Sequence, residues 1–372
     1  MNRSSASDTP KIVNYTADQL RHFVSQLFVA ARVTQFEADR IAESLVESNL
    51  RGHDSHGIVL ARWYLSQIQS GELQPGAPLV VRRDLPGALV CDAGLGFGQV
   101  QCHEFVNRCC EKATTAGAVC GTLTRCGHIG RLGEWVEQAA KLGFAALIAV
   151  NDNGAIYTVA PPGGIDRRLS TNPISIGIPT DGDPLVLDMS TSAVANGKLK
   201  IARLAQRPVP LGWIQDAEGN PTTDPEVMLA DPPGSLLPFG GDQAYKGFGL
   251  GLVFDILAAG LSGGFCPPAE PGALEWNNVL LVVWNPGQFA GREHFLTEAE
   301  RLIAFVRSAR CKPGVDQIQL PGDRGLECRR DRLKNGLPLS DEYLRPLLEI
   351  AGKMGVAFPE IPQVRSEESR VD

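Results

Sequence analysis

The chain has 372 residues, of which 43% are hydrophobic and 21% charged, and its formal net charge is −7. This length and composition are those of a globular protein of two or three domains. The negative charge argues against nucleic acid as a partner, because phosphate binding needs a basic face. The longest apolar stretch, residues 248–261, is too short to span a bilayer and contains Asp255, so no membrane contact is expected.

The N-terminus lacks the apolar core of a signal peptide, and residues 1–12 are predicted to be a disordered lead. The nine cysteines include no C-x-x-C pair and no cluster with histidines at zinc spacing. An odd number of cysteines without a disulfide framework fits a reducing compartment. We therefore expect a cytoplasmic protein without a metal site, whose cysteines are mostly small buried side chains.

Three helices are predicted at the start of the chain. Thr16-Ala-Asp-Gln19 matches a capping box and opens the first helix. Thr34-Gln-Phe-Glu37 opens the second, which Gly52 would end. Ser55 is placed to cap a third helix, from about His56 to Gln69. The chain is thus expected to begin as an antiparallel helical cluster.

The run Arg51-Gly-His-Asp-Ser-His-Gly57 places His56 at the start of that third helix. A helix N-terminus carries about half a positive charge. An imidazole there should hold its extra proton loosely and exchange it near neutral pH. This is what a general acid needs when a carbonyl is reduced, although a single histidine is more often structural.

Further along the chain, strands alternate with helices. The predicted strands are residues 88–92, 117–124, 145–151, 174–178, 184–188 and 279–284. The predicted helices are residues 99–116, 130–142, 190–205, 246–261, 297–310 and 340–354. Residues 206–245 are rich in proline and are expected to be mostly loop.

Gly94-Leu-Gly-Phe-Gly98 lies between a predicted strand and a predicted helix, as a dinucleotide-binding turn would. The Rossmann fingerprint G-x-G-x-x-G would place its third glycine at position 99, which is Gln99. No acidic residue closes the next strand, which ends Cys120-Gly-Thr-Leu. A tight turn before a helix explains the run better.

Three further segments could bind a ligand. His128 lies in Arg125-Cys-Gly-His-Ile-Gly130, a turn between a strand and a helix that could bring it to the same cleft as His56. Asp188-Met-Ser-Thr-Ser192 could offer amides and hydroxyls to a phosphate or ribose, and simple N-capping explains it equally well. In residues 240–249, Lys246 could meet an anion, and a flexible loop is the alternative. This segment is not a P-loop, which needs Ser or Thr after its Gly-Lys, because Gly247 and Phe248 follow Lys246 here.

Seven segments, in one order, resemble the type-2 malate/L-lactate dehydrogenase family, which includes ureidoglycolate, sulfolactate and diketogulonate enzymes and cyclic-imine reductases. They cover about residues 15 to 355 and are Leu50–Gly57, Cys126–Gly130, Thr171–Pro173, Leu187–Ala193, Gly219–Asp224, Leu237–Gly241 with Tyr245–Gly249, and Leu320–Asp323. One such motif would be weak, but seven in order are a specific signal.

The resemblance implies an α/β (α+β), non-Rossmann malate/L-lactate dehydrogenase-like fold. A mostly antiparallel sheet would bind the cofactor, and helices from both termini would form another domain. Residues 1–120 would form the N-terminal helical and substrate or dimer region, residues 121–300 the NAD(P)-binding sheet domain, and residues 301–372 C-terminal helices that pack back on the N-terminal region. Two subunits would share the active-site region, so a homodimer is expected.

The resemblance also implies roles for single residues. His56 would be the proton donor or acceptor, and His128 a second proton-transfer residue. Arg51, Ser55 and Arg62 would position the substrate or tune His56. The positions expected to contact NAD or NADP are Asp152, Asp188, Met189, Ser190, Tyr245, Lys246, Gly322, Asp323 and Arg324. Asp188 could orient an imidazole or ribose hydroxyls, and both roles stay open.

Two positions depart from the family. Many members have an arginine four residues after the catalytic histidine, where it can hold the substrate carboxylate; here that position is Leu60, and Arg62 is the nearest arginine. Asp152 stands where some members have a serine that touches the phosphate of NADP. A carboxylate there would repel that phosphate, which favours NAD.

The expected reaction is hydride transfer between nicotinamide and C2 of a small 2-hydroxy or 2-oxo acid, similar to malate or lactate. The first alternative is reduction of a cyclic imine carboxylate, such as pyrroline- or piperideine-2-carboxylate. A nucleotide-binding protein without turnover and a cofactor-free lyase are alternatives from other classes.

Overall fold

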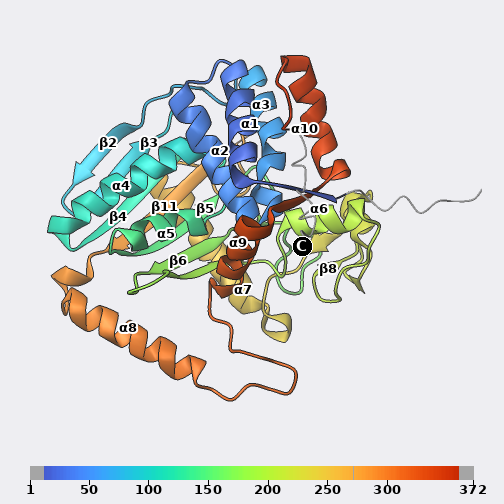
Figure 1. Cartoon of the computed structure of the whole chain (residues 1–372). Coiled ribbons are helices and arrows are strands. Elements are labelled where there is room, and N and C mark those ends of the chain that lie inside the picture. The colour runs from blue at the N-terminus through green and yellow to red at the C-terminus, as the bar shows by residue number, and fades with distance from the viewer. Residues whose placement is uncertain (1–11, 271, 360–372) are drawn as a thin grey trace, which may run out of the picture. The chain divides into compact units, whose positions relative to one another are not determined.

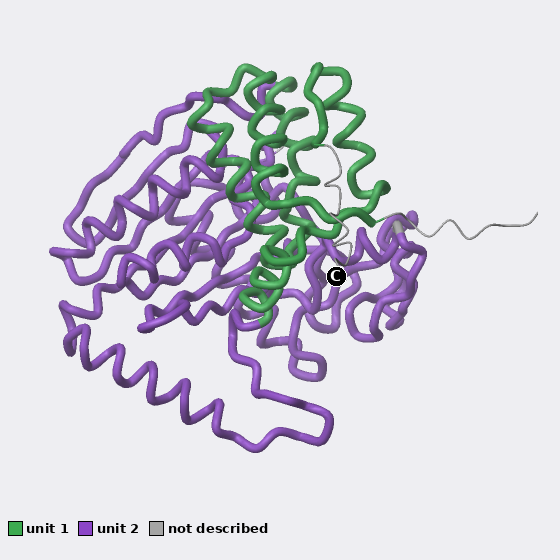
Figure 2. Tube along the Cα trace, viewed as in Figure 1, with its two compact units in different colours: residues 1–70, 324–372 green, residues 71–323 purple. Residues whose placement is uncertain are grey.

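The computed structural model describes residues 12–270 and 272–359. The chain divides into two compact units, unit 1 with residues 1–70 and 324–372 and unit 2 with residues 71–323 (Figure 2). The lead expected over residues 1–12 lies outside the described residues, except for Ile12. Residues 71–120, grouped above with the N-terminal helices, contribute two strands and a helix to unit 2, because these strands pair in its large sheet.

Unit 1 joins segments from both ends of the chain. The N-terminal segment contains β1 (Ile12–Tyr15), α1 (Ala17–Ala30), α2 (Gln35–Leu50), the single 3₁₀ turns η1 (Asp54–His56) and η2 (Ile58–Leu60), and α3 (Ala61–Ser70). The C-terminal segment contains α9 (Asp323–Asn335), β12 (Leu337–Ser340) and α10 (Asp341–Met354). Strands β1 and β12 pair antiparallel, with Ile12 opposite Ser340, which ties the two segments together.

The first two helices begin where the sequence predicts. Thr16 Oγ1 accepts from the Gln19 amide at 3.2 Å, and Gln19 Oε1 accepts from the Thr16 amide at 3.0 Å, which completes the capping box. Thr34 Oγ1 accepts from the Glu37 amide at 3.3 Å. Each cap satisfies backbone donors that have no partner within the helix, so both predictions are confirmed.

The prediction of a continuous helix from His56 is wrong. His56 ends the 3₁₀ turn η1, Gly57 is extended, and the α-helix begins only at Ala61. The interruption has a local cause: the Asn49 side-chain oxygen accepts the Ile58 amide at 2.9 Å. The argument that a helix N-terminus loosens the extra proton of His56 therefore does not hold.

Unit 2 is built on a seven-stranded sheet of order β2-β3-β4-β11-β5-β6-β7. Its strands are β2 (Val80–Leu85), β3 (Ala88–Asp92), β4 (Ala118–Cys126), β5 (Ala145–Asn151), β6 (Ile174–Ile178), β7 (Leu185–Met189) and β11 (Asn277–Trp284). β3 and β4 pair parallel, and every other neighbouring pair is antiparallel. The mixed α/β fold expected from the sequence is confirmed.

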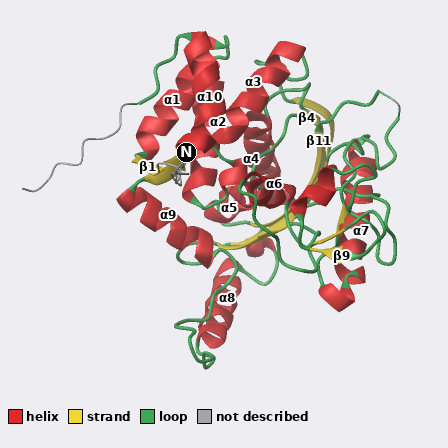
Figure 3. Cartoon of the chain, turned by 90° about the vertical axis from the view of Figure 1, so that its right-hand side faces the viewer, coloured by secondary structure: helices red, strands yellow, loops and turns green. Residues whose placement is uncertain are grey.

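Helices cover both faces of this sheet. α4 (Gly98–Ala116) and α5 (Gly133–Lys141) lie on one side of the strands and α7 (Tyr245–Ser262) on the other (Figures 1 and 3). Trp135, Phe105 and alternate residues of β4, β5 and β11 form the core beneath α4 and α5. This packing positions the turns at the strand ends, where the candidate site residues lie.

α7 is long and apolar enough to cross a membrane by length and composition, which is weak support for a span. Its Asp255 is buried and accepts hydrogen bonds from Asn151 at 2.9 Å and Asn172 at 2.7 Å. The helix also packs against β5 and β11. These contacts are those of a helix that covers the sheet of unit 2.

Six short elements lie between β7 and α7: α6 (Asn196–Leu204), β8 (Ile214–Gln215), β9 (Pro221–Thr222), η3 (Pro225–Leu229), β10 (Ser235–Leu236) and η4 (Gly241–Gln243). Two further elements, η5 (Pro286–Gln288) and α8 (Arg292–Arg307), follow β11. The prediction of a helix from residue 190 is wrong, because the Thr191 amide donates to Thr171 and the Ala193 amide to Leu237, which holds the segment extended.

Candidate active site

In unit 1, the loop between α2 and α3 carries Ser55 and His56 side by side. Ser55 Oγ lies 3.1 Å from His56 Nδ1, within hydrogen-bond distance. Both residues are partly exposed. If the hydroxyl donates to Nδ1, the neutral ring carries its own proton on Nε2. The pair can therefore present an exchangeable proton to a bound molecule.

The two arginines predicted near the substrate differ in their surroundings. Arg51 Nε donates to Glu47 Oε1 at 3.0 Å, and Arg329 Nε of α9 donates to the same oxygen at 2.7 Å. Arg62 lies exposed on α3. Gly325 of α9 lies against the Arg51 side chain. Its neighbour Arg324 is therefore also near Arg51 in unit 1, and it is exposed.

In unit 2, His128 lies in the turn that follows β4. Gln99 Nε2 donates to the His128 carbonyl at 3.3 Å, and the Ile129 amide donates to Asn277 Oδ1 at 2.9 Å. Trp135 Nε1 donates to the Ile129 carbonyl at 3.0 Å. The turn is thus fixed to three neighbouring elements, and the His128 side chain is half-buried.

A buried charge network joins this turn to the end of β7. Arg131 donates to both carboxylate oxygens of Glu137 at 3.2 Å and lies 3.9 Å from Asp188 Oδ2. The Gly133 amide donates to that same oxygen at 2.8 Å. Burial raises the pKa of Asp188, and Arg131 and the Gly133 amide offset part of the rise. The sequence analysis missed Arg131, Gly133 and Glu137, since a buried charge pair has no pattern of its own in one sequence.

Two predicted cofactor segments lie next to each other in unit 2. The Val186 amide of β7 donates to the Pro321 carbonyl at 3.3 Å, so Gly322 and Asp323 lie beside the strand that ends in Asp188 and Met189. Ser190 follows, and its hydroxyl donates to the Ser192 carbonyl at 3.0 Å. No pattern in the sequence predicts that these distant segments are neighbours.

Asp152 lies at the end of β5 and is only 9% exposed. Neither carboxylate oxygen has a well-formed hydrogen bond among the described residues; the Ser170 side chain and the Ile156 amide lie near enough to lower its pKa without meeting that geometry. Burial raises its pKa to about 6; Asp255 and Glu275 add to the rise, and nearby Ser170 opposes it. A buried carboxylate without a well-formed hydrogen bond is suited to a molecule that brings hydrogen-bond donors.

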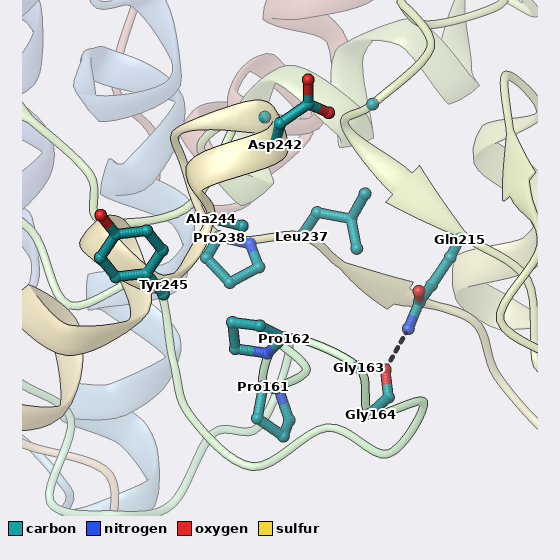
Figure 4. A pocket seen from close by; sticks show the side chains of 12 residues that line it. Pro161, Pro162, Gly163, Gly164, Gln215, Leu237, Pro238, Asp242, Ala244 and Tyr245 are labelled. Atoms are coloured by element: carbon teal, nitrogen blue, oxygen red, sulfur yellow. Dashed lines mark hydrogen bonds between the residues drawn. The ribbon is translucent and has the colours of Figure 1, made fainter.

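Tyr245 lines a cavity of about 450 Å³ in unit 2 (Figure 4). The walls are mostly proline and glycine, and Pro161, Pro162 and Pro238 lie between Tyr245 and Gln215 in this view. Gln215 Nε2 donates to the Gly164 carbonyl at 2.8 Å across one end. Lys246 Nζ lies 5.9 Å from the Tyr245 ring centroid. Of the predicted site residues, Tyr245 is the one in this lining.

The predicted site residues therefore form separate groups within the units. Unit 1 brings together Ser55 and His56, and also Arg51 and the start of α9. Unit 2 brings together the His128 turn, Asp188 and the segment 320–323, while Asp152 and Tyr245 lie in other surroundings. Among the described residues, no three His, Cys, Asp or Glu side chains gather as metal ligands would.

Comparison with known proteins identifies the family. A family model described as malate/L-lactate dehydrogenase matches residues 15–348. The chain belongs to the malate/L-lactate dehydrogenase family. Family membership makes the chain a dehydrogenase that acts on hydroxy acids and implies a nicotinamide cofactor.

Relatives cover nearly the whole chain. An L-lactate dehydrogenase from Cupriavidus necator is 34% identical over 91% of this chain and 97% of its own length. A Δ1-pyrroline-2-carboxylate/Δ1-piperideine-2-carboxylate reductase from Pseudomonas syringae is 34% identical over 95% of this chain and 100% of its own. A solved structure of a putative malate/lactate dehydrogenase from E. coli has a TM-score of 0.86 and 33% identity, and covers 92% of this chain and 96% of that one.

Proposed function

We propose that this dehydrogenase transfers a hydride reversibly between a nicotinamide cofactor and C2 of a small 2-hydroxy or 2-oxo acid, similar to malate or lactate. The observation that carries the proposal is the Ser55–His56 pair, with 3.1 Å between Oγ and Nδ1. With the Ser55 hydroxyl donating to Nδ1, the neutral ring carries its exchangeable proton on Nε2. The family supplies the reaction class, and this pair supplies the proton.

The described residues fit a nicotinamide dinucleotide. The buried oxygens of Asp152 have no well-formed hydrogen bond among the described residues, and the hydroxyls of a ribose are donors. The residues that would hold the cofactor are Asp152, Asp188, Met189, Ser190, Tyr245, Lys246, Gly322, Asp323 and Arg324. The bound nicotinamide would supply the hydride in reduction and accept it in oxidation. The carboxylate of Asp152 would repel a 2′-phosphate, so we favour NAD over NADP.

His56 would donate a proton to the substrate carbonyl oxygen in reduction and take the hydroxyl proton back in oxidation. General acid–base help of this kind is typically worth about 10²–10⁴-fold in rate. His128 would be a second proton-transfer residue, in a turn that Gln99 and Asn277 hold in place. With Leu60 where an arginine often stands, Arg51 and Arg62 are the candidates to hold the substrate carboxylate.

The same residues could reduce a cyclic imine carboxylate, with a C=N bond in place of C=O. The similarity to the Pseudomonas syringae reductase, over all of its length, favours this second candidate.

We also propose that the part of the seven-stranded sheet within residues 121–300 binds the cofactor in a non-Rossmann arrangement. Its largely antiparallel pairing supports this, since a Rossmann sheet is mostly parallel. We propose a homodimer as well, supported by the exposed apolar side chains of Phe289, Leu302 and Phe305 on and before α8. The nine free thiols fit a cytoplasmic location.

The test is to follow oxidation of NADH and of NADPH by ultraviolet absorbance, each with a panel of 2-oxo acids and cyclic imine carboxylates. His56→Ala is measured beside the wild type, with folding checked by circular dichroism. One cofactor oxidised by one substrate, with turnover lost in His56→Ala, supports the proposal. Cofactor binding without turnover would favour a nucleotide-binding protein. If neither NADH nor NADPH binds, the dehydrogenase mechanism is contradicted. Light scattering tests the homodimer, which a strict monomer would contradict.

A further inference from the structure

We propose that Arg332 and Tyr343, from the two C-terminal helices of unit 1, are positioning residues for the Ser55–His56 pair. This inference rests on the proposed role of His56 as the proton donor. Neither residue belongs to a motif that the sequence analysis singled out. Both act through Asp54, the residue before Ser55.

The turn that carries His56 needs outside support. η1 has three residues and closes with backbone bonds from His56 to His53 at 2.8 Å and from Gly57 to Asp54 at 3.2 Å. A single 3₁₀ turn with two such bonds does not hold its conformation alone, because ordering the first turn costs more than its bonds return. Its geometry must therefore be set by tertiary contacts.

Arg332 of α9 supplies the strongest of these contacts. Its Nη1 donates to Asp54 Oδ1 at 2.7 Å and its Nη2 to Asp54 Oδ2 at 3.0 Å. This is a two-point ion pair, which fixes orientation as well as distance. The Arg332 side chain is 14% exposed, so water competes little for it. Asn49 Nδ2 completes the carboxylate's partners, donating to Oδ1 at 2.7 Å.

Tyr343 of α10 holds the backbone of the same residue. Its hydroxyl donates to the Asp54 carbonyl at 2.8 Å, the carbonyl that also closes the turn. Burial raises the pKa of this phenol well above its usual range, so the hydroxyl keeps its proton and remains a donor. Asp54 is thus fixed at its side chain by α9 and at its backbone by α10.

The far side of His56 is held by Asn49. Its side-chain oxygen accepts the Ile58 amide at 2.9 Å, while its amide group donates to Asp54. Arg332 also donates to the Asn49 carbonyl. A Cβ on Gly57 would lie 2.2 Å from the Asn49 side chain. Ser55 and His56 therefore lie in a short segment whose two ends, Asp54 and Ile58, are both held by side chains. Arg332 contacts both Asp54 and Asn49, the residue that binds Ile58.

The test compares four variants in the full chain. Arg332→Met removes the bidentate ion pair with Asp54. Arg332→Lys keeps the positive charge but cannot donate to both carboxylate oxygens as the guanidinium does, and Tyr343→Phe removes one hydroxyl. Lys334→Met is the matched control, since it removes a positive charge from an exposed position of the same helix. For each we measure kcat, the KM of the nicotinamide cofactor, melting temperature and the NMR titration of the His56 ring, assigned with His56→Asn.

We expect Arg332→Met to lower kcat by up to about 100-fold, because a displacement of about 1 Å at the reacting group can cost that much. Tyr343→Phe should lower it less, Arg332→Lys should recover part of the loss, and the KM of the cofactor should change by less than about threefold. The His56 resonances should shift in Arg332→Met and Tyr343→Phe but not in Lys334→Met. A merely structural role would lower the melting temperature and leave the His56 titration of the folded protein unchanged.

The outcomes separate this inference from the proposed function. If wild type turns over no substrate, the proposed function fails, and the ring titration alone still decides whether Arg332 and Tyr343 position His56. If Arg332→Met does not fold, Tyr343→Phe decides. Wild-type kcat and an unshifted His56 titration in folded Arg332→Met or Tyr343→Phe would overturn the inference.

Discussion

The carboxylate of Asp188 accepts a hydrogen bond at 2.8 Å from the backbone amide of Gly133, so the end of β7 is tied to the first turn of α5. This contact satisfies an amide that has no partner within the helix. It also places the Asp188 side chain beside Arg131, in the segment that continues from His128. The residue predicted to orient an imidazole or a ribose thus also joins two segments of the candidate site.

Gly133→Ala should destabilise the protein by about 2–4 kcal/mol, since a methyl group there adds overlap in a packed interior. A Cβ at Gly133 would lie 2.2 Å from Arg131 Nη1 and 2.8 Å from Asp188 Oδ2. Urea unfolding measures the change. Gly260→Ala in α7 is the control, because its Cβ would meet nothing within 4 Å and alanine favours a helix. Equal stability of the two variants would contradict the close approach.

Arg131→Met should cost about 3–5 kcal/mol of unfolding free energy, because it leaves Glu137 and Asp188 buried without their cation. Glu137→Met should also destabilise. The double variant should lose less than the sum of the two single losses, since neither buried partner of the pair is then left alone. A double-mutant cycle by urea unfolding measures this coupling, and strictly additive losses would show that the pair contributes no coupling.

Asp152→Asn should stabilise the protein at neutral pH by about 1–3 kcal/mol. The pKa of Asp152 is raised to about 6 by burial, so the folded state binds its proton more tightly than the unfolded chain does. The stability linked to that proton is complete below about pH 4 and is lost as pH rises through about 6. The gain from Asp152→Asn should therefore grow between these values in urea unfolding at a series of pH values.

Asp216 is the control for this prediction, because its pKa shift has the opposite sign to that of Asp152. Hydrogen bonds from the Asn220 amide and its neighbours lower the pKa of this exposed carboxylate. Its contribution is lost as pH falls, so Asp216→Asn should give no gain on going to neutral pH. A gain of the same size in both variants would point to a general charge effect rather than to the burial of Asp152.

Asp152→Ser should raise the ratio of kcat/KM for NADPH to that for NADH by about tenfold or more, because it removes a negative charge that would repel the 2′-phosphate. Steady-state rates with each cofactor measure the ratio, and Asp216→Ser is the surface control. An unchanged ratio would remove Asp152 from cofactor selection while leaving the proposed reaction intact.

Local signals in the sequence predicted much of the fold. Thr16 and Thr34 mark helix starts because capping depends on residues three apart, and β3 and β6 match their predicted strands because short apolar runs are bounded by turn residues. The helix predicted from His56 failed because Asn49, seven residues earlier, takes the Ile58 amide and an extended Gly57 interrupts the helix. α9 was missed altogether, since its residues are mostly polar and it has no apolar stripe.

The sequence by itself determined the family, the candidate residues His56, His128 and Asp152, and most helices and strands, because each depends on residues close together in the chain or on motifs in order. Only the tertiary structure decided which distant groups meet. Arg332 and Tyr343 reach Asp54 across more than 270 positions, and Pro321 lies beside β7. Such contacts depend on how helices and strands pack, and packing joins side chains that no spacing in a single sequence relates.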